Sequence, residues 1–155
     1  MDRLTAGSVA GLASGIVVGT ISQILHALGI CRMCLVSIGG GMFLREMLGA
    51  TAPLYWQLVG WATHLIISGL LGVFTVYILV LTGREYALWK GLLFGAAVWF
   101  LSIAFISPLA GYLPRNASPA DFFIVLAYHL LFGALTAWLL VRYAKHALMR
   151  KIDST

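Results

Sequence analysis

Four long stretches of the chain contain no Asp, Glu, Lys or Arg, and they constrain the fold more than any other feature. They cover residues 4–30, 56–81, 91–110 and 122–141. A helix needs about 20 apolar residues to cross a bilayer, whereas a membrane strand needs about half that number and alternates apolar with polar residues. These stretches are long enough and do not alternate. The sequence therefore predicts an all-α integral membrane protein, a four-helix bundle that forms a single domain over residues 1–155.

The composition argues against an ordinary soluble domain. The chain is 61% hydrophobic and only 10% charged, whereas soluble domains are about 25% charged. A net charge of +5 could suggest a nucleic-acid partner, but the basic residues are distributed as in a membrane protein. We therefore expect the lipid bilayer as a partner and no nucleic acid.

The basic residues also predict the orientation of the chain. In a four-span arrangement, seven of the ten Lys and Arg residues fall on the side of the termini. Cytoplasmic loops carry an excess of Lys and Arg, so both termini are predicted to be cytoplasmic. The first span is too long for a signal peptide and no clear cleavage site follows it, so we expect it to be retained. The predicted inner residues are Arg3, Arg84, Lys90, Arg142, Lys145, Arg150 and Lys151, and the outer ones are Arg32, Arg45 and Arg115.

Glycine recurs every fourth residue in the first span, at Gly7, Gly11, Gly15 and Gly19. On a helix these positions form one stripe without side chains, and Gly-xxx-Gly stripes let membrane helices approach closely. The stripe predicts packing within the chain or a seam between two copies, so a homo-oligomer or a membrane-complex partner fits the pattern. The other glycines expected at helix contacts are Gly60, Gly72, Gly91, Gly95 and Gly133.

The second half of the chain repeats features of the first. Gly91 and Gly95 in the third span recur in the register of Gly11 and Gly15 in the first span. Both copies would start on the cytoplasmic side. The sequence thus predicts a duplicated two-helix hairpin, with parallel repeats related by a two-fold axis along the membrane normal.

Three histidines lie within the predicted spans. The repeat pairs His64 with His129, at matching depth in the outer half, and His26 lies nearer the outer surface. Ionisable residues within membranes are candidates for function. Either each histidine bonds across a helix interface and no cofactor is bound, or His64 and His129, with His26, hold haem or a transition metal.

Cys31 and Cys34 form a Cys-x-x-Cys motif next to Arg32, on the predicted outer side. Such a pair can cycle through a disulfide, which persists in an oxidising compartment. Disulfide-generating enzymes of the DsbB type carry this motif after their first span, but they need a second cysteine pair and this chain has 2 cysteines. A redox pair, a structural disulfide and two free thiols are the alternatives.

The connection from residue 31 to residue 55 is too long for a simple turn. After the run Gly39–Gly41, residues 42–50 combine apolar side chains with the adjacent charges of Arg45 and Glu46. This pattern fits a short helix at the membrane surface, and an ordinary loop over the bundle is the alternative.

Short motifs along most of the chain resemble the YagU and YqhR type of small bacterial inner-membrane proteins. The resemblance implies a bacterial inner-membrane location and brings no established activity. The residues that carry it are Phe43-Leu44-Arg45-Glu46, Leu48-Gly49, Thr63-His64, Leu88-Trp89-Lys90-Gly91-Leu92-Leu93 with Gly95, Ser107-Pro108-Leu109 with Gly111 and Pro114, and His129-Leu130.

Three classes of function fit these observations. The leading hypothesis is a non-enzymatic membrane protein that packs helices or binds a partner. The alternatives are a redox protein that holds haem or a metal at His64 and His129, and a small transporter. The predicted spans contain no carboxylate, which argues against a proton pump with a carboxylate relay.

Overall fold

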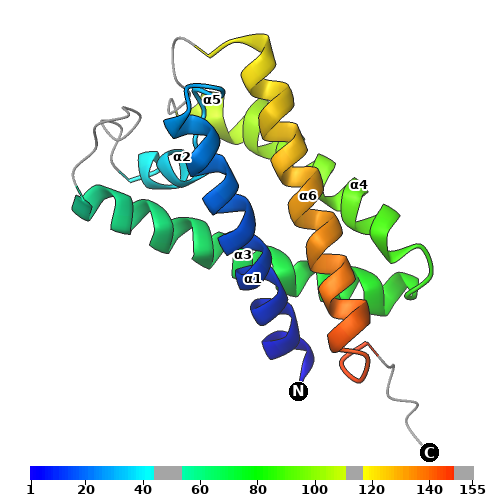
Figure 1. The fold of residues 1–155 in the computed structure, drawn as a ribbon. Helices are drawn as coiled ribbons and strands as arrows, with labels where there is room; N and C mark the ends of the chain where they lie inside the picture. Colours follow the sequence, from blue (N-terminus) through cyan, green and yellow to red (C-terminus); the bar gives the residue numbers. More distant parts are fainter. Residues whose placement is uncertain (44–53, 111–116, 149–155) are drawn as a thin grey trace, which may run out of the picture.

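A computed structural model describes residues 1–43, 54–110 and 117–148, and within these ranges the chain is helical without strands (Figure 1). Four of its helical segments are long and apolar enough to cross a membrane. The prediction of an all-α four-helix membrane bundle is confirmed, and the chain is a multi-pass membrane protein. The membrane-spanning segments are Arg3–Ala27, Leu54–Thr82, Ala87–Leu109 and Pro119–Tyr143.

The helices pack as two pairs. Helix α1 (Arg3–Ala27) packs mainly on α3 (Leu54–Thr82), helix α4 (Ala87–Phe100) packs on α6 (Pro119–Tyr143), and the pairs meet chiefly where α1 contacts α6. The start of α1 and the end of α6 lie at the same end of the bundle (Figure 1). The elements are α1 (Arg3–Ala27), α2 (Leu35–Gly41), α3 (Leu54–Thr82), α4 (Ala87–Phe100), the π-helical segment η2 (Leu101–Ile106), α5 (Ser107–Ala110) and α6 (Pro119–Tyr143).

Side-chain caps determine where α1 and α6 begin. The Asp2 carboxylate accepts a hydrogen bond of 2.9 Å from the Thr5 backbone N–H, which satisfies one of the free donors at the helix start. Helix α6 begins with a capping box between Ser118 and Asp121, with Pro119 in its first turn. Pro119 is suited to this position because its missing N–H would have no helical partner there.

The third span widens into η2 just before Pro108. Proline lacks a backbone N–H, and its ring clashes with the preceding turn of a regular α-helix. The Ser107 backbone N–H bonds to the Ser102 carbonyl, five residues earlier, and the Ser107 hydroxyl donates to the same oxygen at 2.7 Å. Short π-helical segments are frequent at functional sites, and η2 forms one wall of the cavity described below.

The short helix α2 differs from the helix that the sequence predicts in this connection. The predicted surface helix, residues 42–50, lies almost entirely outside the described residues. The structure has α2 at Leu35–Gly41, where the glycine run disfavours a helix. The Leu35 N–H donates to the Ser22 hydroxyl at 2.8 Å, and a methyl group at Gly60 of α3 would lie 2.5 Å from the Val36 carbonyl oxygen. Close packing on α3 therefore offsets the poor helix propensity of α2.

Candidate functional site: a cavity with two histidines

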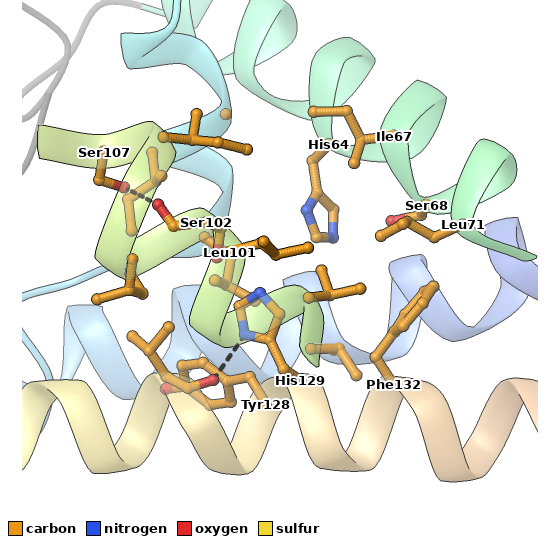
Figure 2. Close-up of a pocket in the computed structure, with 18 of the residues that line it drawn as sticks. His64, Ile67, Ser68, Leu71, Leu101, Ser102, Ser107, Tyr128, His129 and Phe132 are labelled. Atoms are coloured by element: carbon orange, nitrogen blue, oxygen red, sulfur yellow. Dashed lines mark hydrogen bonds between the residues drawn. The ribbon is translucent and has the colours of Figure 1, made fainter. Parts of the chain in front are cut away.

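A cavity of about 310 Å³ lies between α2, α3, η2 and α6. We call it the histidine cavity, because the rings of His64 and His129 extend into it from α3 and α6 (Figure 2). Its volume is at the lower limit of typical small-molecule sites. Most of its wall is apolar, and its polar side chains are His64, Ser68, Ser102, Ser107, Tyr128 and His129.

The hydrogen bond of His64 joins the two helices of the first pair. Its Nε2 atom lies 3.0 Å from the backbone carbonyl oxygen of Gly15. A carbonyl oxygen only accepts hydrogen bonds, so Nε2 must carry the proton. In a neutral imidazole the other nitrogen, Nδ1, then bears a lone pair.

The hydrogen bond of His129 stays within its own helix. Its Nδ1 atom lies 2.8 Å from the Val125 carbonyl oxygen, so Nδ1 carries the proton (Figure 2). In the neutral ring, Nε2 is therefore the unprotonated nitrogen. The two histidines thus adopt opposite tautomers, and each leaves one nitrogen as an acceptor.

The serine hydroxyls of η2 and α5 donate to backbone carbonyls. Ser102 donates to the Trp99 carbonyl oxygen at 3.0 Å, and Ser107 donates to the Ser102 carbonyl oxygen at 2.7 Å. A hydroxyl has one proton. Toward the cavity, these two side chains therefore act only as acceptors.

Apolar side chains surround the more exposed part of the histidine cavity. Met42, Leu101 and Ile106 are 46%, 53% and 47% exposed, whereas the lining residues Val125 and Phe132 are 0% and 6% exposed. The cavity therefore extends from the buried side of α6 toward the surface between α2 and η2. Because η2 belongs to a segment long and apolar enough to cross a membrane, we expect this surface to face lipid.

His26 does not line the histidine cavity. Its Nδ1 atom lies 2.9 Å from the Cys31 carbonyl oxygen, just beyond the end of α1. The structure thus brings His64 and His129 to one cavity and places His26 in the last turn of α1, bonded to the chain that follows. Within the described ranges, no three or more His, Cys, Asp or Glu side chains are grouped to hold a metal ion. Haem or metal binding by the two cavity histidines stays a prediction.

Cys31 and Cys34 are buried free thiols, 1% and 3% exposed. The Cys31 Sγ donates to the Met33 carbonyl oxygen at 3.3 Å. Burial raises the pKa of the Cys31 thiol above its usual value, which disfavours the reactive thiolate. Neither the redox role nor the disulfide is tested by this arrangement, so both stay predictions.

Asp121 and Tyr128 are buried polar residues that the sequence analysis does not identify. Asp121 precedes the predicted span 122–141 by one residue, but α6 includes it, and it is 2% exposed. Its carboxylate accepts hydrogen bonds of 2.7 Å from the backbone N–H groups of Arg32 and Ser118 and from the Ser118 hydroxyl. The Ser-x-x-Asp spacing with Pro119 is the sequence signal for this cap. The Tyr128 hydroxyl, in contrast, is buried without a partner, and no pattern in the sequence predicts that.

The glycines of the sequence analysis lie at contacts within the chain. A methyl group at Gly11 would overlap the Ser68 carbonyl oxygen, and one at Gly91 would overlap the Gly133 carbonyl oxygen. The remaining contacts are Gly7 with Val73, Gly15 with Ser68, Gly19 with Trp61 and His64, Gly60 with Val36, Gly72 with Gly7 and Gly11, Gly95 with His129, and Gly133 with Gly91.

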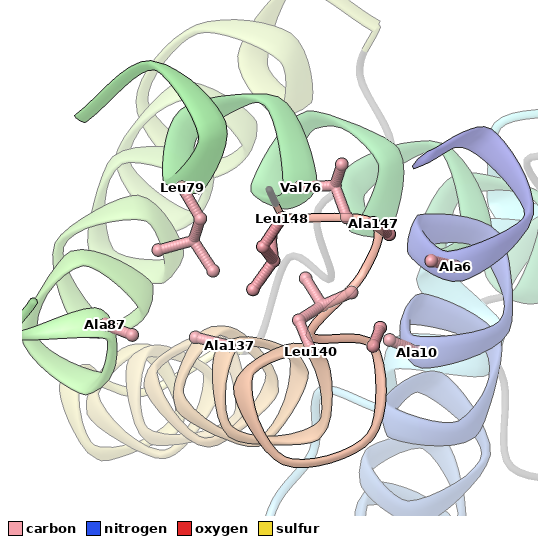
Figure 3. Packing of buried hydrophobic residues seen from close by; sticks show 10 residues of the cluster. Ala6, Ala10, Val76, Leu79, Ala87, Ala137, Leu140, Ala147 and Leu148 are labelled. Atoms are coloured by element: carbon pink, nitrogen blue, oxygen red, sulfur yellow. The ribbon is translucent and has the colours of Figure 1, made fainter. Parts of the chain in front are cut away.

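Apolar side chains fill the end of the bundle that holds the start of α1 and the end of α6. After α6 the chain turns back and inserts Leu148 between α3 and α6 (Figure 3). The Arg3 Nε donates to the Ala147 carbonyl oxygen at 3.2 Å and ties this turn to α1. We call this group the basal cluster: Ala6, Ala10, Val76, Leu79, Ala87, Ala137, Leu140, Ala144, Ala147 and Leu148.

No protein-family model, curated protein or solved structure matches this chain.

Proposed function

We propose that this chain is a non-enzymatic protein of the bacterial inner membrane that binds a small, mostly apolar molecule in the histidine cavity. The observation that carries the proposal is the cavity itself, about 310 Å³ in volume, with two imidazoles in an otherwise mainly apolar wall. Ligand sites typically combine an apolar lining with a few polar groups that orient the ligand.

The basal cluster favours binding over transport. A transporter needs a polar path to each side of the membrane. On one side of the histidine cavity, between the cavity and the termini, lie the ten buried apolar residues of the basal cluster. A cavity whose most exposed lining residues are apolar suits a molecule that enters and leaves from the lipid.

The glycine contacts support intramolecular packing over a homodimer seam. Backbone-to-backbone contacts at Gly11 and Gly72, and at Gly91 and Gly133, join α1 to α3 and α4 to α6. A stripe that is covered by another helix of the same chain is not free to pair with a second copy. The glycines therefore hold α1 on α3 and α4 on α6 within one chain, and the bilayer is the partner around them.

The register of these contacts supports the proposed duplication. Gly11 in α1 lies against Ser68 in α3, and Gly91 in α4 lies against Gly133 in α6. Ser68 and Gly133 each follow the histidine of their helix by one turn. A duplicated hairpin would explain why the two helix pairs meet at matching positions.

The position of the basic residues supports the proposed orientation. Arg3, Arg84, Lys90 and Arg142 flank the ends of spans at the end of the bundle that holds the termini. An excess of positive charge there favours a cytoplasmic location for both termini. The histidine cavity then lies in the outer half of the bilayer. A bacterial inner-membrane location rests on the resemblance to the YagU and YqhR type.

The two acceptor nitrogens also favour a second candidate, haem or transition-metal binding at His64 and His129. An imidazole nitrogen with a lone pair is a metal ligand. Haem gives a Soret absorbance band, which His64→Leu or His129→Leu would abolish. A colourless protein that binds no metal after incubation with haem, zinc or copper would eliminate this candidate.

Ligand binding to the cavity can be tested with two aromatic probes, 4-ethylphenol and its methyl ether, 4-ethylanisole. A ligand that binds only the folded state raises the midpoint of thermal unfolding. We expect at least one probe to do so for the protein in lipid nanodiscs. Val98→Phe, which places a ring in the cavity, should abolish the shift. Val17→Phe, on an exposed face of α1 outside the lining, should preserve it. Equal shifts in both variants, or no shift with either probe, would contradict the proposed function.

A further inference from the structure

We infer that the molecule in the histidine cavity presents a hydrogen-bond donor, so that its class is a neutral apolar compound with a hydroxyl group, such as a phenol or an alcohol. This inference deepens the proposed function and rests on it. It depends on the tautomers of the two histidines and on whether the other polar atoms of the cavity can donate or only accept a hydrogen bond.

Both imidazole protons are used inside the protein. The proton of His64 lies on Nε2 toward Gly15, and that of His129 lies on Nδ1 toward Val125. Reversing either tautomer would place a lone pair against a carbonyl oxygen, which repels it. The backbone therefore imposes the tautomers, and a ligand meets acceptor nitrogens.

The hydroxyls nearby reinforce this acceptor character. Ser102 and Ser107 have donated their protons to carbonyl oxygens. An acceptor-only ligand, such as a ketone or an ether, would leave these acceptor atoms unsatisfied, at the cost of buried polar atoms without a hydrogen bond. Two hydroxyls of the lining are competing donors, that of Tyr128, which has no partner, and that of Ser68. If either served the ligand, an ether would bind as well as a phenol.

The surroundings of the cavity define the rest of the ligand. Among the described residues, no charged side chain lines it, so an ion held by these residues would be desolvated without a counter-charge, at high cost. The exposed residues on its open side, Met42, Leu101 and Ile106, are apolar. We therefore assign the ligand to the molecules dissolved in the bilayer, whose apolar part enters between α2 and η2.

The test compares 4-ethylphenol with 4-ethylanisole, which differ by a methyl group on the oxygen and hence by the donor. Binding is measured in nanodiscs, with each probe expressed as a mole fraction in the bilayer. We expect the wild-type protein to bind the phenol tighter by a factor on the order of five, the effect of one net hydrogen bond. His129→Leu should reduce this preference to about one. His146→Leu, at an exposed residue after α6, should leave it unchanged.

His129→Leu should fold, because the Val125 carbonyl retains its helical backbone bond from residue 129. His64→Leu is the second variant and should also lower the preference for the phenol. Equal affinity of wild-type protein for both probes, with loss of both in Val98→Phe, would overturn the donor assignment and leave the proposed function standing. A preference for the phenol that survives in both histidine variants would also overturn it. Failure of both probes to bind would overturn the proposed function itself.

Discussion

The imidazole of His64 in α3 is bonded to the backbone carbonyl of Gly15 in α1, with 3.0 Å between Nε2 and the oxygen. The histidine that the proposed repeat pairs with it, His129, bonds instead to Val125 of its own helix. The two imidazoles therefore bond differently, although the proposed duplication would make them equivalent. One links two helices, the other is held locally, and both direct an unprotonated nitrogen to the cavity between them.

The close approach of α1 and α3 predicts a sharp difference between two glycines. Gly11→Ala places a methyl group against the Ser68 carbonyl oxygen and the Gly72 backbone, so we expect a loss of about 1–3 kcal/mol in unfolding free energy from overpacking. At Gly69 the nearest atoms, in the Leu12 side chain, would be 3.7 Å from the added carbon. Gly69→Ala should therefore be neutral or stabilising. Unfolding in mixed detergent measures both, and equal stability of the two variants would show that the glycine contact is misassigned.

The buried cap of α6 should contribute more to stability than the exposed cap of α1. Asp121→Ala removes bonds to Ser118 and to the Arg32 N–H, and we expect a loss of about 3 kcal/mol. Asp2→Ala removes an exposed cap and should cost less. Hydrogen exchange should show faster opening of residues 31–34 only in Asp121→Ala. If hydrogen exchange at residues 31–34 were unchanged in Asp121→Ala, the Asp121 carboxylate would not be what holds this segment in place.

The Asp2 cap should also respond to pH. Hydrogen bonds from the Thr5 backbone and side chain lower the pKa of Asp2 below 3.8. Because the folded-state pKa is lowered, the cap contributes fully above the unfolded value and is lost as the pH falls through the folded value. We expect the first turn of α1 to fray below about pH 3.8, measured by amide exchange at residues 3–6. Asp2→Asn should remove this dependence on pH, and an identical profile in that variant would assign the fraying to another group.

The sequence predicts the fold well because the bilayer leaves few alternatives for long apolar stretches. The four uncharged stretches are sufficient to predict four spanning helices, and the Gly-xxx-Gly spacing selects the faces that meet. The widening at η2 and the helix at Leu35–Gly41 could not be predicted, since each depends on tertiary contacts: Ser107 with Ser102, and Val36 with Gly60. Local propensity alone argues against a helix with three successive glycines.

The candidate site could be predicted only in part. Spacing pairs His64 with His129, but the cavity between them depends on how α2 and η2 pack, which no local pattern encodes. The tautomers depend on two backbone carbonyls, at Gly15 and Val125. His26 illustrates the limit, because its position toward the outer end of a predicted span does not show whether it joins the cavity, and it does not line it.

The cysteines should react only when the protein unfolds. Cys31 and Cys34 are buried, and the raised pKa of Cys31 keeps its thiol protonated. At neutral pH we expect slow maleimide labelling of the folded protein and rapid labelling of both thiols after denaturation without reductant. Rapid labelling of the folded protein would contradict the burial. Labelling of the denatured protein only after addition of reductant would reveal a disulfide.

The central claim is that the histidine cavity presents two acceptor nitrogens on opposite tautomers. Solid-state nitrogen-15 NMR of the protein in lipid, with histidine labelled and resonances assigned from His64→Leu and His129→Leu, measures this directly. We predict a protonated Nε2 in His64, a protonated Nδ1 in His129, and a shift of the unprotonated nitrogens when 4-ethylphenol, but not 4-ethylanisole, is added. The same tautomer in both rings, or unprotonated nitrogens that respond equally to the two probes, would contradict the account.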